Sequence, residues 1–158
     1  MPLSPTAQKV QDLLASGGFD CKVIEFTEST RTAQEAANRV GVKLGQIVKS
    51  LIFKGQASNK PVLVLTSGAN RVDETRISEY AREAIGRADA DFVRAATGFA
   101  IGGVPPLGHL QAMETYLDED LMQYDVIWAA AGTPKAVFEL TPDALKQMTK
   151  GTVVKVKS

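Results

Sequence analysis

Two apolar runs that follow each other closely constrain the fold most. Ile47–Lys54 (IVKSLIFK) and Pro61–Thr66 (PVLVLT) are rich in β-branched residues, and a polar connection containing Gly, Ser and Asn separates them. This pattern predicts a hairpin of two core strands. Shorter runs of the same character predict further strands over residues 21–26, 99–101, 113–117, 124–130, 136–140 and 152–157.

Helices are predicted where a capping residue precedes apolar residues at helical spacing. Ser4-Pro5 begins the first helix and Gly17-Gly18 ends it, while Thr32 begins the second and Gly41 closes it. The same signals predict helices over residues 73–85, 89–95 and 144–149. Because strands outnumber helices and mostly follow one another directly, we predict an α/β fold of the α+β type. Its sheet is expected to be mixed, largely antiparallel and barrel-like, with flanking helices.

Composition limits the classes of function. The 158 residues are 44% apolar and 23% charged, which predicts one soluble domain over residues 1–158. Its 18 Lys and Arg balance 18 Asp and Glu, which argues against duplex DNA as a partner but not against a nucleic acid held by a local basic patch. Without a secretory signal or a membrane-length apolar run, we expect a cytoplasmic protein and no membrane partner. Monomer and homodimer both remain open.

Lys49 interrupts the first apolar run. Strand alternation places it on one face with Ile47, Leu51 and Phe53, and places Ser50 on the other face. Two interpretations follow from this pattern. The lysine either snorkels to water from an edge strand, or its ammonium faces a cavity and acts there as a strong electrostatic group.

The segment Thr97–His109 (TGFAIGGVPPLGH) holds four glycines, two adjacent prolines and the sole histidine of the chain. Glycine allows close approach of the backbone to a ligand, so the amides of Gly102, Gly103 and Val104 could converge on a carbonyl oxygen. A plain tight turn between strands is the alternative. His109 is either a structural histidine or a group that positions substrate or transfers a proton. A single histidine offers no second ligand, so we expect neither a metal nor a cofactor.

These features resemble a known family. Gly102-x-x-x-Pro106-x-Gly108-His109 is similar to the GxxxPxGH signature of the YbaK / prolyl-tRNA synthetase-associated domains, which are the bacterial prolyl-tRNA editing, ProX-like deacylases. The run Gln46–Phe53, which includes Lys49, and the alanine-rich stretch that begins at Thr32 follow the order and spacing of that family. The resemblance covers nearly the whole chain.

The resemblance implies a free-standing aminoacyl-tRNA deacylase. Such an enzyme hydrolyses the ester that joins a wrong, small amino acid (Ala, Cys, Ser or Thr) to the 3′ adenosine of tRNA(Pro) or a related tRNA. It implies Lys49 as the essential lysine, with Gly102, Gly103 and His109 as the other catalytic candidates. The expected substrate-binding residues are Phe26, Thr30, Ile47, Leu51, Ile101, Val104, Pro106 and Gly108.

Two other classes of function remain open. The chain could be a non-catalytic module that binds an aminoacyl or nucleotide end or docks on a synthetase. It could also be a small-molecule esterase, although no nucleophile with a base partner is visible. An intact lysine together with an intact signature favours the deacylase, since a docking module need not keep both. Whether a synthetase partner is required stays open.

Overall fold

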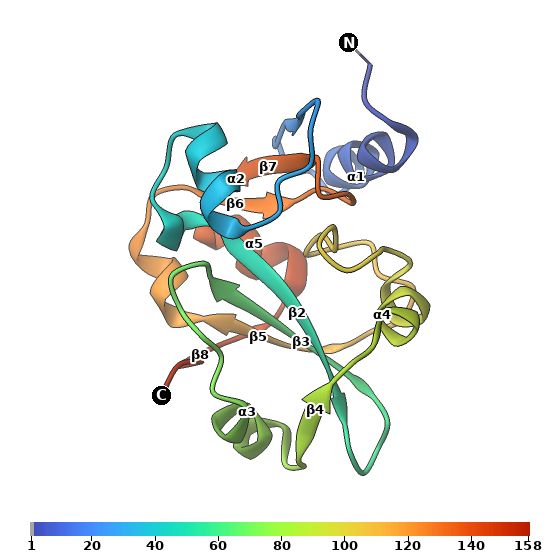
Figure 1. The fold of residues 1–158 in the computed structure, drawn as a ribbon, viewed down its shortest axis with the longest axis vertical. Coiled ribbons are helices and arrows are strands. Elements are labelled where there is room, and N and C mark those ends of the chain that lie inside the picture. Colours follow the sequence, from blue (N-terminus) through green and yellow to red (C-terminus); the bar gives the residue numbers. More distant parts are fainter. Residues whose placement is uncertain (1) are drawn as a thin grey trace.

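The computed structural model describes residues 2–158, and its strands form two sheets (Figure 1). The larger sheet has the order β4-β2-β3-β5-β8, and the smaller sheet has the order β1-β7-β6. The strands are β1 (Val23–Glu25), β2 (Val48–Gly55), β3 (Pro61–Ser67), β4 (Ile85–Arg87), β5 (Glu114–Asp118), β6 (Ile127–Ala130), β7 (Ala136–Leu140) and β8 (Thr152–Val154).

The fold class predicted from the sequence is confirmed. Strand pairs β1–β7, β2–β3, β2–β4 and β6–β7 are antiparallel, whereas β3–β5 and β5–β8 are parallel. The strands do not close into one barrel. Instead, a single bridge between Ile47 and Trp128 joins the start of β2 to the smaller sheet.

Five α-helices and two short 3-10 helices surround the sheets in the described part of the chain. They are α1 (Pro5–Ser16), α2 (Ala33–Val40), α3 (Glu74–Ala81), α4 (Ala90–Thr97), α5 (Pro142–Thr149), η1 (Leu44–Gln46) and η2 (Glu119–Gln123). The predicted caps are present, because the hydroxyl of Ser4 accepts from the Ala7 N–H and that of Thr32 accepts from the Glu35 N–H. Gly41 closes α2 in the left-handed conformation, as expected.

The core divides into clusters on the two faces of the long β2–β3 hairpin. Val48 and Ile52 join the largest cluster, while Phe53 packs in a second cluster with Ile77 of α3. Strand alternation produces this division, because neighbouring side chains of β2 point to opposite faces. A third, smaller cluster packs α2 against the smaller sheet around Trp128.

Several predicted elements differ from the structure, and the strands predicted over residues 21–26 and 152–157 are shorter than expected. The helix expected over residues 73–85 ends at Ala81, because Arg82 adopts a left-handed φ of 62° and Ile85 instead pairs with Gly55 in β4. The strand expected over residues 99–101 is a turn, and the strand expected from residue 124 begins at Ile127 after the 3-10 helix η2. Cys21 lies before β1 rather than in it. It is half-buried, and burial raises the pKa of its thiol.

Helix length sets one further limit. No helix within residues 2–158 is both long enough and apolar enough to cross a membrane.

Candidate functional site

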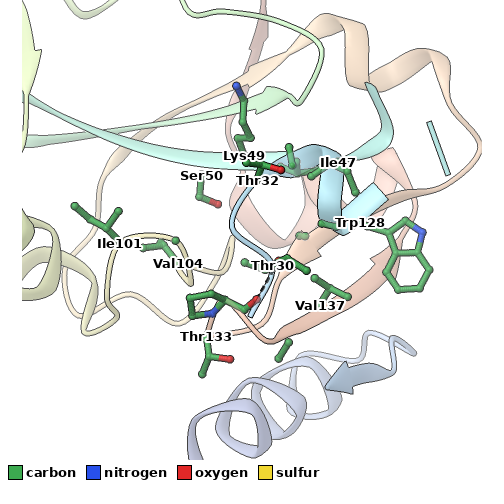
Figure 2. A pocket seen from close by; sticks show the side chains of 18 of the residues that line it. Thr30, Thr32, Ile47, Lys49, Ser50, Ile101, Val104, Trp128, Thr133 and Val137 are labelled. Carbon is green, nitrogen blue, oxygen red and sulfur yellow. Dashed lines mark hydrogen bonds between the residues drawn. The ribbon is translucent and has the colours of Figure 1, made fainter. Parts of the chain in front are cut away.

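A cavity of about 270 Å³ lies where the middle of β2, the start of α2, the smaller sheet and the 97–109 segment meet. We call it the first cavity (Figure 2). Its walls are mainly apolar, and the smaller sheet supplies Trp128, Ala129, Ala130, Ala136 and Val137. Thr30 and Thr32 come from the segment that leads into α2, and Thr133 and Pro134 come from the turn between β6 and β7.

Seven of the residues predicted from the sequence line this cavity. They are Thr30, Ile47, Lys49, Leu51, Ile101, Gly102 and Val104. The structure therefore brings the strand lysine and the glycine turn to one cavity, although they are far apart in the sequence. The apolar wall from the smaller sheet was not predicted.

A second cavity, of about 310 Å³, adjoins the first. The two cavities share part of their lining, namely Lys49, Ser50, Leu51, Ile101 and Val104. Arg71, which follows β3, and Arg87 of β4 line the second cavity together with Glu74. Neither arginine forms an ion pair within the described residues, so both guanidinium groups remain available to an anion.

Lys49 lines both cavities, and a hydrogen bond to the backbone holds its ammonium. Its Nζ donates to the backbone carbonyl of Asn70 at 3.2 Å. Figure 2 shows this Nζ and the hydroxyl of Ser50 on opposite sides of strand β2, as strand alternation requires.

A buried carboxylate fixes the loop that holds Lys49. The amide of Asn70 donates to Asp118 and Asp120, at 2.8 Å in each case. Asp118 is 1% exposed and also accepts from the Ser67 N–H at 2.9 Å. Asp120 in turn pairs with Lys157, and this contact together with the Asn70 bond lowers the pKa of the Asp120 carboxyl. The carbonyl that receives Lys49 is thus held by residues of β3, β5 and η2.

Backbone conformation shapes the glycine turn. Gly102 has a φ of 91°, in the left-handed region that favours glycine. Gly103 is packed closely, since a Cβ at this position would lie 2.7 Å from the carbonyl oxygen of Gly132. Its N–H donates to the Ala100 carbonyl at 3.1 Å, so this amide is already bonded within the turn.

The remaining predicted site residues lie outside the lining of the first cavity. Phe26 packs beside α2, with the guanidinium of Arg39 5.4 Å from the centre of its ring. Pro106, Gly108 and His109 line a separate polar hollow. The Nε2 atom of His109 lies 2.7 Å from the Pro105 carbonyl. Burial lowers the pKa of this imidazole, while the hydrogen bond to Pro105 acts in the opposite direction.

The first cavity offers few groups for acid–base chemistry. None of the described residues that line it is Asp, Glu, His or Cys. Within residues 2–158, no three such side chains gather closely enough to hold a metal ion. The cavity therefore presents hydroxyls, backbone groups and cations to a ligand.

Comparisons with known proteins agree on one family. Residues 27–148 match the family model described as the aminoacyl-tRNA editing domain. The uncharacterised protein YwhH of Bacillus subtilis is 32% identical over 127 residues, which are 80% of each chain. EbsC of Enterococcus faecalis, named as a candidate Cys-tRNA(Pro)/Cys-tRNA(Cys) deacylase, is 26% identical over 83% of this chain and 80% of its own length.

A solved structure extends the similarity over the full length. It is described as a candidate trans-editing enzyme for prolyl tRNA synthetase and is 47% identical to this chain. The match covers 99% of both chains with a TM-score of 0.94.

Proposed function

The chain belongs to the aminoacyl-tRNA editing domain family, and we propose that it is a deacylase that acts in trans on mischarged tRNA. Family membership confirms the resemblance first noted at Gly102–His109. One observation carries the proposal, namely that Lys49 and the glycine turn line the same cavity. We further propose that residues 1–158 act as a single editing domain, which the near-complete match to the solved trans-editing relative supports.

The first cavity would hold the amino acid of the substrate. Its volume of about 270 Å³ and its walls of Ala, Val and Trp suit a small side chain. Binding alone discriminates weakly between side chains that differ by a methylene, so a second hydrolytic sieve of limited size adds accuracy. A larger residue would be excluded by the walls of this cavity, which include Val137.

The glycine turn would receive the ester carbonyl. We assign the N–H groups of Gly102 and Val104 to the oxyanion that develops during hydrolysis. The initial expectation included the Gly103 N–H, but its bond to Ala100 makes Gly103 a packing residue in this proposal. The close fit of Gly103 against the 132–133 backbone would hold the other two amides in place.

Lys49 would bind the nucleotide end of the substrate. Lys49 lines both cavities, and Arg71 and Arg87 line the second cavity. Three cations around an otherwise largely apolar cavity suit a terminal adenosine and its phosphates. Glu74 is the acidic residue among the described residues that line the second cavity.

The water that attacks the ester would be activated by the substrate. An aminoacyl ester is already reactive, so positioning and oxyanion stabilisation supply much of the required rate enhancement. No described residue that lines the first cavity carries a carboxylate or an imidazole, which supports a ribose hydroxyl or the free amine of the substrate as the base. His109 would act as a positioning residue that holds the turn through Pro105.

A deacylation assay tests this function. The protein is incubated with tRNA(Pro) charged separately with alanine, cysteine, serine or threonine, and correctly charged Pro-tRNA(Pro) is the control. We expect release of at least one small amino acid and none of proline. Absence of release from every mischarged tRNA would overturn the proposal and favour a binding module.

A further inference from the structure

The hydroxyl of Ser50 is a polar group that the proposed mechanism does not use. Its Oγ is buried and has no hydrogen-bond partner within residues 2–158. A buried hydroxyl without a partner costs free energy, and native proteins retain few such groups. Ser50 lines the first cavity, and Figure 2 shows its Oγ on the side of β2 that faces Val104 and Thr133.

The other hydroxyls of the first cavity already have partners. Thr30 donates to the Pro134 carbonyl at 3.0 Å, and Thr32 accepts from the Glu35 N–H at 3.1 Å. Thr133 accepts from the Lys135 N–H at 3.1 Å. Ser50 is therefore the cavity hydroxyl without an internal bond in the described chain.

One more buried polar atom in this region lacks a partner, the indole Nε1 of Trp128. Figure 2 shows this indole turned away from Ser50, so the two groups do not face a common ligand atom. Because the Ser50 hydroxyl has no partner within the described residues, it is left to form a hydrogen bond with a bound substrate.

The groups of an aminoacyl ester differ in how well they would match the Ser50 hydroxyl as a hydrogen-bond partner. The α-ammonium carries three donors and needs several acceptors, which one hydroxyl does not provide. A neutral side-chain hydroxyl both donates and accepts a single bond, which matches Ser50. We propose that Ser50 is a specificity-determining residue that selects seryl and threonyl esters over alanyl esters. This inference rests on the proposed function.

The test compares substrates rather than a single rate. Values of kcat/KM are measured for Ser-, Thr- and Ala-tRNA(Pro) with the wild type and with Ser50→Ala. Loss of one neutral hydrogen bond should lower hydrolysis of the seryl and threonyl esters about tenfold. Hydrolysis of the alanyl ester should stay unchanged, so the Ser/Ala preference collapses.

Thr133→Val is the matched control. It removes a hydroxyl from the same cavity, but one that already has a backbone partner. We expect it to preserve the Ser/Ala preference, and thermal unfolding of both variants checks that the fold is retained. Ser50→Thr keeps a hydroxyl and should retain part of the preference.

Three results would overturn this assignment. The first is a wild type that hydrolyses alanyl and seryl esters equally well. The second is an equal loss on all substrates in Ser50→Ala, which would place Ser50 on a part that every substrate shares. The third is an unchanged Ser/Ala preference in that variant.

Binding measurements separate this inference from the proposed function. Non-hydrolysable adenosine analogues with seryl or alanyl groups in 3′-amide linkage are titrated into the wild type and Ser50→Ala. Tighter binding of the seryl analogue that depends on Ser50 would support the inference even if no ester were hydrolysed. Equal binding of the two analogues by the wild type would contradict it, whatever the turnover.

Discussion

Strand β2 and the 97–109 segment both contribute to the first cavity, but they do so by different means. The strand presents side chains, and its alternation sends Lys49 and Ser50 to opposite faces. The segment presents backbone, and its shape depends on glycines at Gly102 and Gly103 that differ in conformation and packing. The strand is therefore sensitive to the chemistry of its side chains, whereas the turn is sensitive to the conformation and packing of its backbone.

Lys49→Ala should have the largest effect on activity, because it removes a charged side chain from the strand while leaving the backbone intact. Loss of a cation that binds the nucleotide end should lower kcat/KM for a mischarged tRNA by about a hundredfold or more. The free energy of unfolding should change little, since Lys49 is half-buried and bonds to a single carbonyl. Denaturant titration and deacylation kinetics measure the two quantities.

Lys60→Ala is the control for this variant, because Lys60 is an exposed lysine in the turn of the same hairpin. It should keep full activity. Normal turnover by Lys49→Ala would remove the lysine from the mechanism.

Gly103→Ala should damage the turn. The new Cβ would lie 2.7 Å from both the Gly132 oxygen and the Cα of Thr133, and these backbone atoms have little freedom to move. We expect a loss of about 1–3 kcal/mol in the free energy of unfolding and at least about a tenfold loss of activity.

Gly102→Ala is the comparison for Gly103→Ala, because the added Cβ at Gly102 would not clash with neighbouring atoms. The nearest heavy atom is Pro134 Cγ at 3.7 Å, so the cost is the strain of a left-handed alanine, about 1 kcal/mol. Equal destabilisation by the two alanines would contradict the packing role given to Gly103.

Features that depend on neighbouring residues could be predicted from the sequence, whereas features that depend on distant residues could not. Local signals identified the β2–β3 hairpin and the caps at Ser4 and Thr32, since each depends on neighbouring residues. The predicted end of the third helix at Ile85 was wrong. Ile85 fits a helical period, but it pairs with Gly55, which is distant in the sequence. Non-local pairing is not visible in one short window of sequence.

The candidate site divides in the same way. Alternation predicted the face of Lys49, and composition predicted that the backbone of the glycine turn could approach a ligand closely. Composition did not show that the Gly103 N–H is bonded to Ala100, since that depends on the path of the chain. Trp128 and Val137 were missed because their place in the cavity depends on how the smaller sheet meets β2. That the Ser50 hydroxyl has no hydrogen-bond partner likewise could be recognised only from the contacts around it in the structure.

Arg71→Ala tests the second cavity and should have a moderate effect. Loss of one phosphate contact should raise KM about three- to tenfold and leave kcat nearly unchanged. The slope of log KM against log salt concentration should also fall by about one. Arg94→Ala, at an exposed position of α4 outside both cavities, is the control and should leave both quantities unchanged. An unchanged salt dependence in Arg71→Ala would place the phosphates elsewhere.

Substitution of His109 should have the smallest effect, which is a change in how the free energy of unfolding depends on pH. Burial lowers the pKa of His109 in the folded state, so the unfolded chain, with a pKa of about 6.5, binds a proton more readily. Stability contributed by the neutral imidazole is therefore present above about pH 6.5 and is lost as the pH falls below it. His109→Gln, which keeps a neutral donor near the Pro105 carbonyl, should flatten this dependence between about pH 7 and pH 5. Urea unfolding of both proteins across that range measures the difference, and the contribution of the carboxylates cancels in it. Parallel curves for the two proteins would show that His109 titrates alike in the folded and unfolded states.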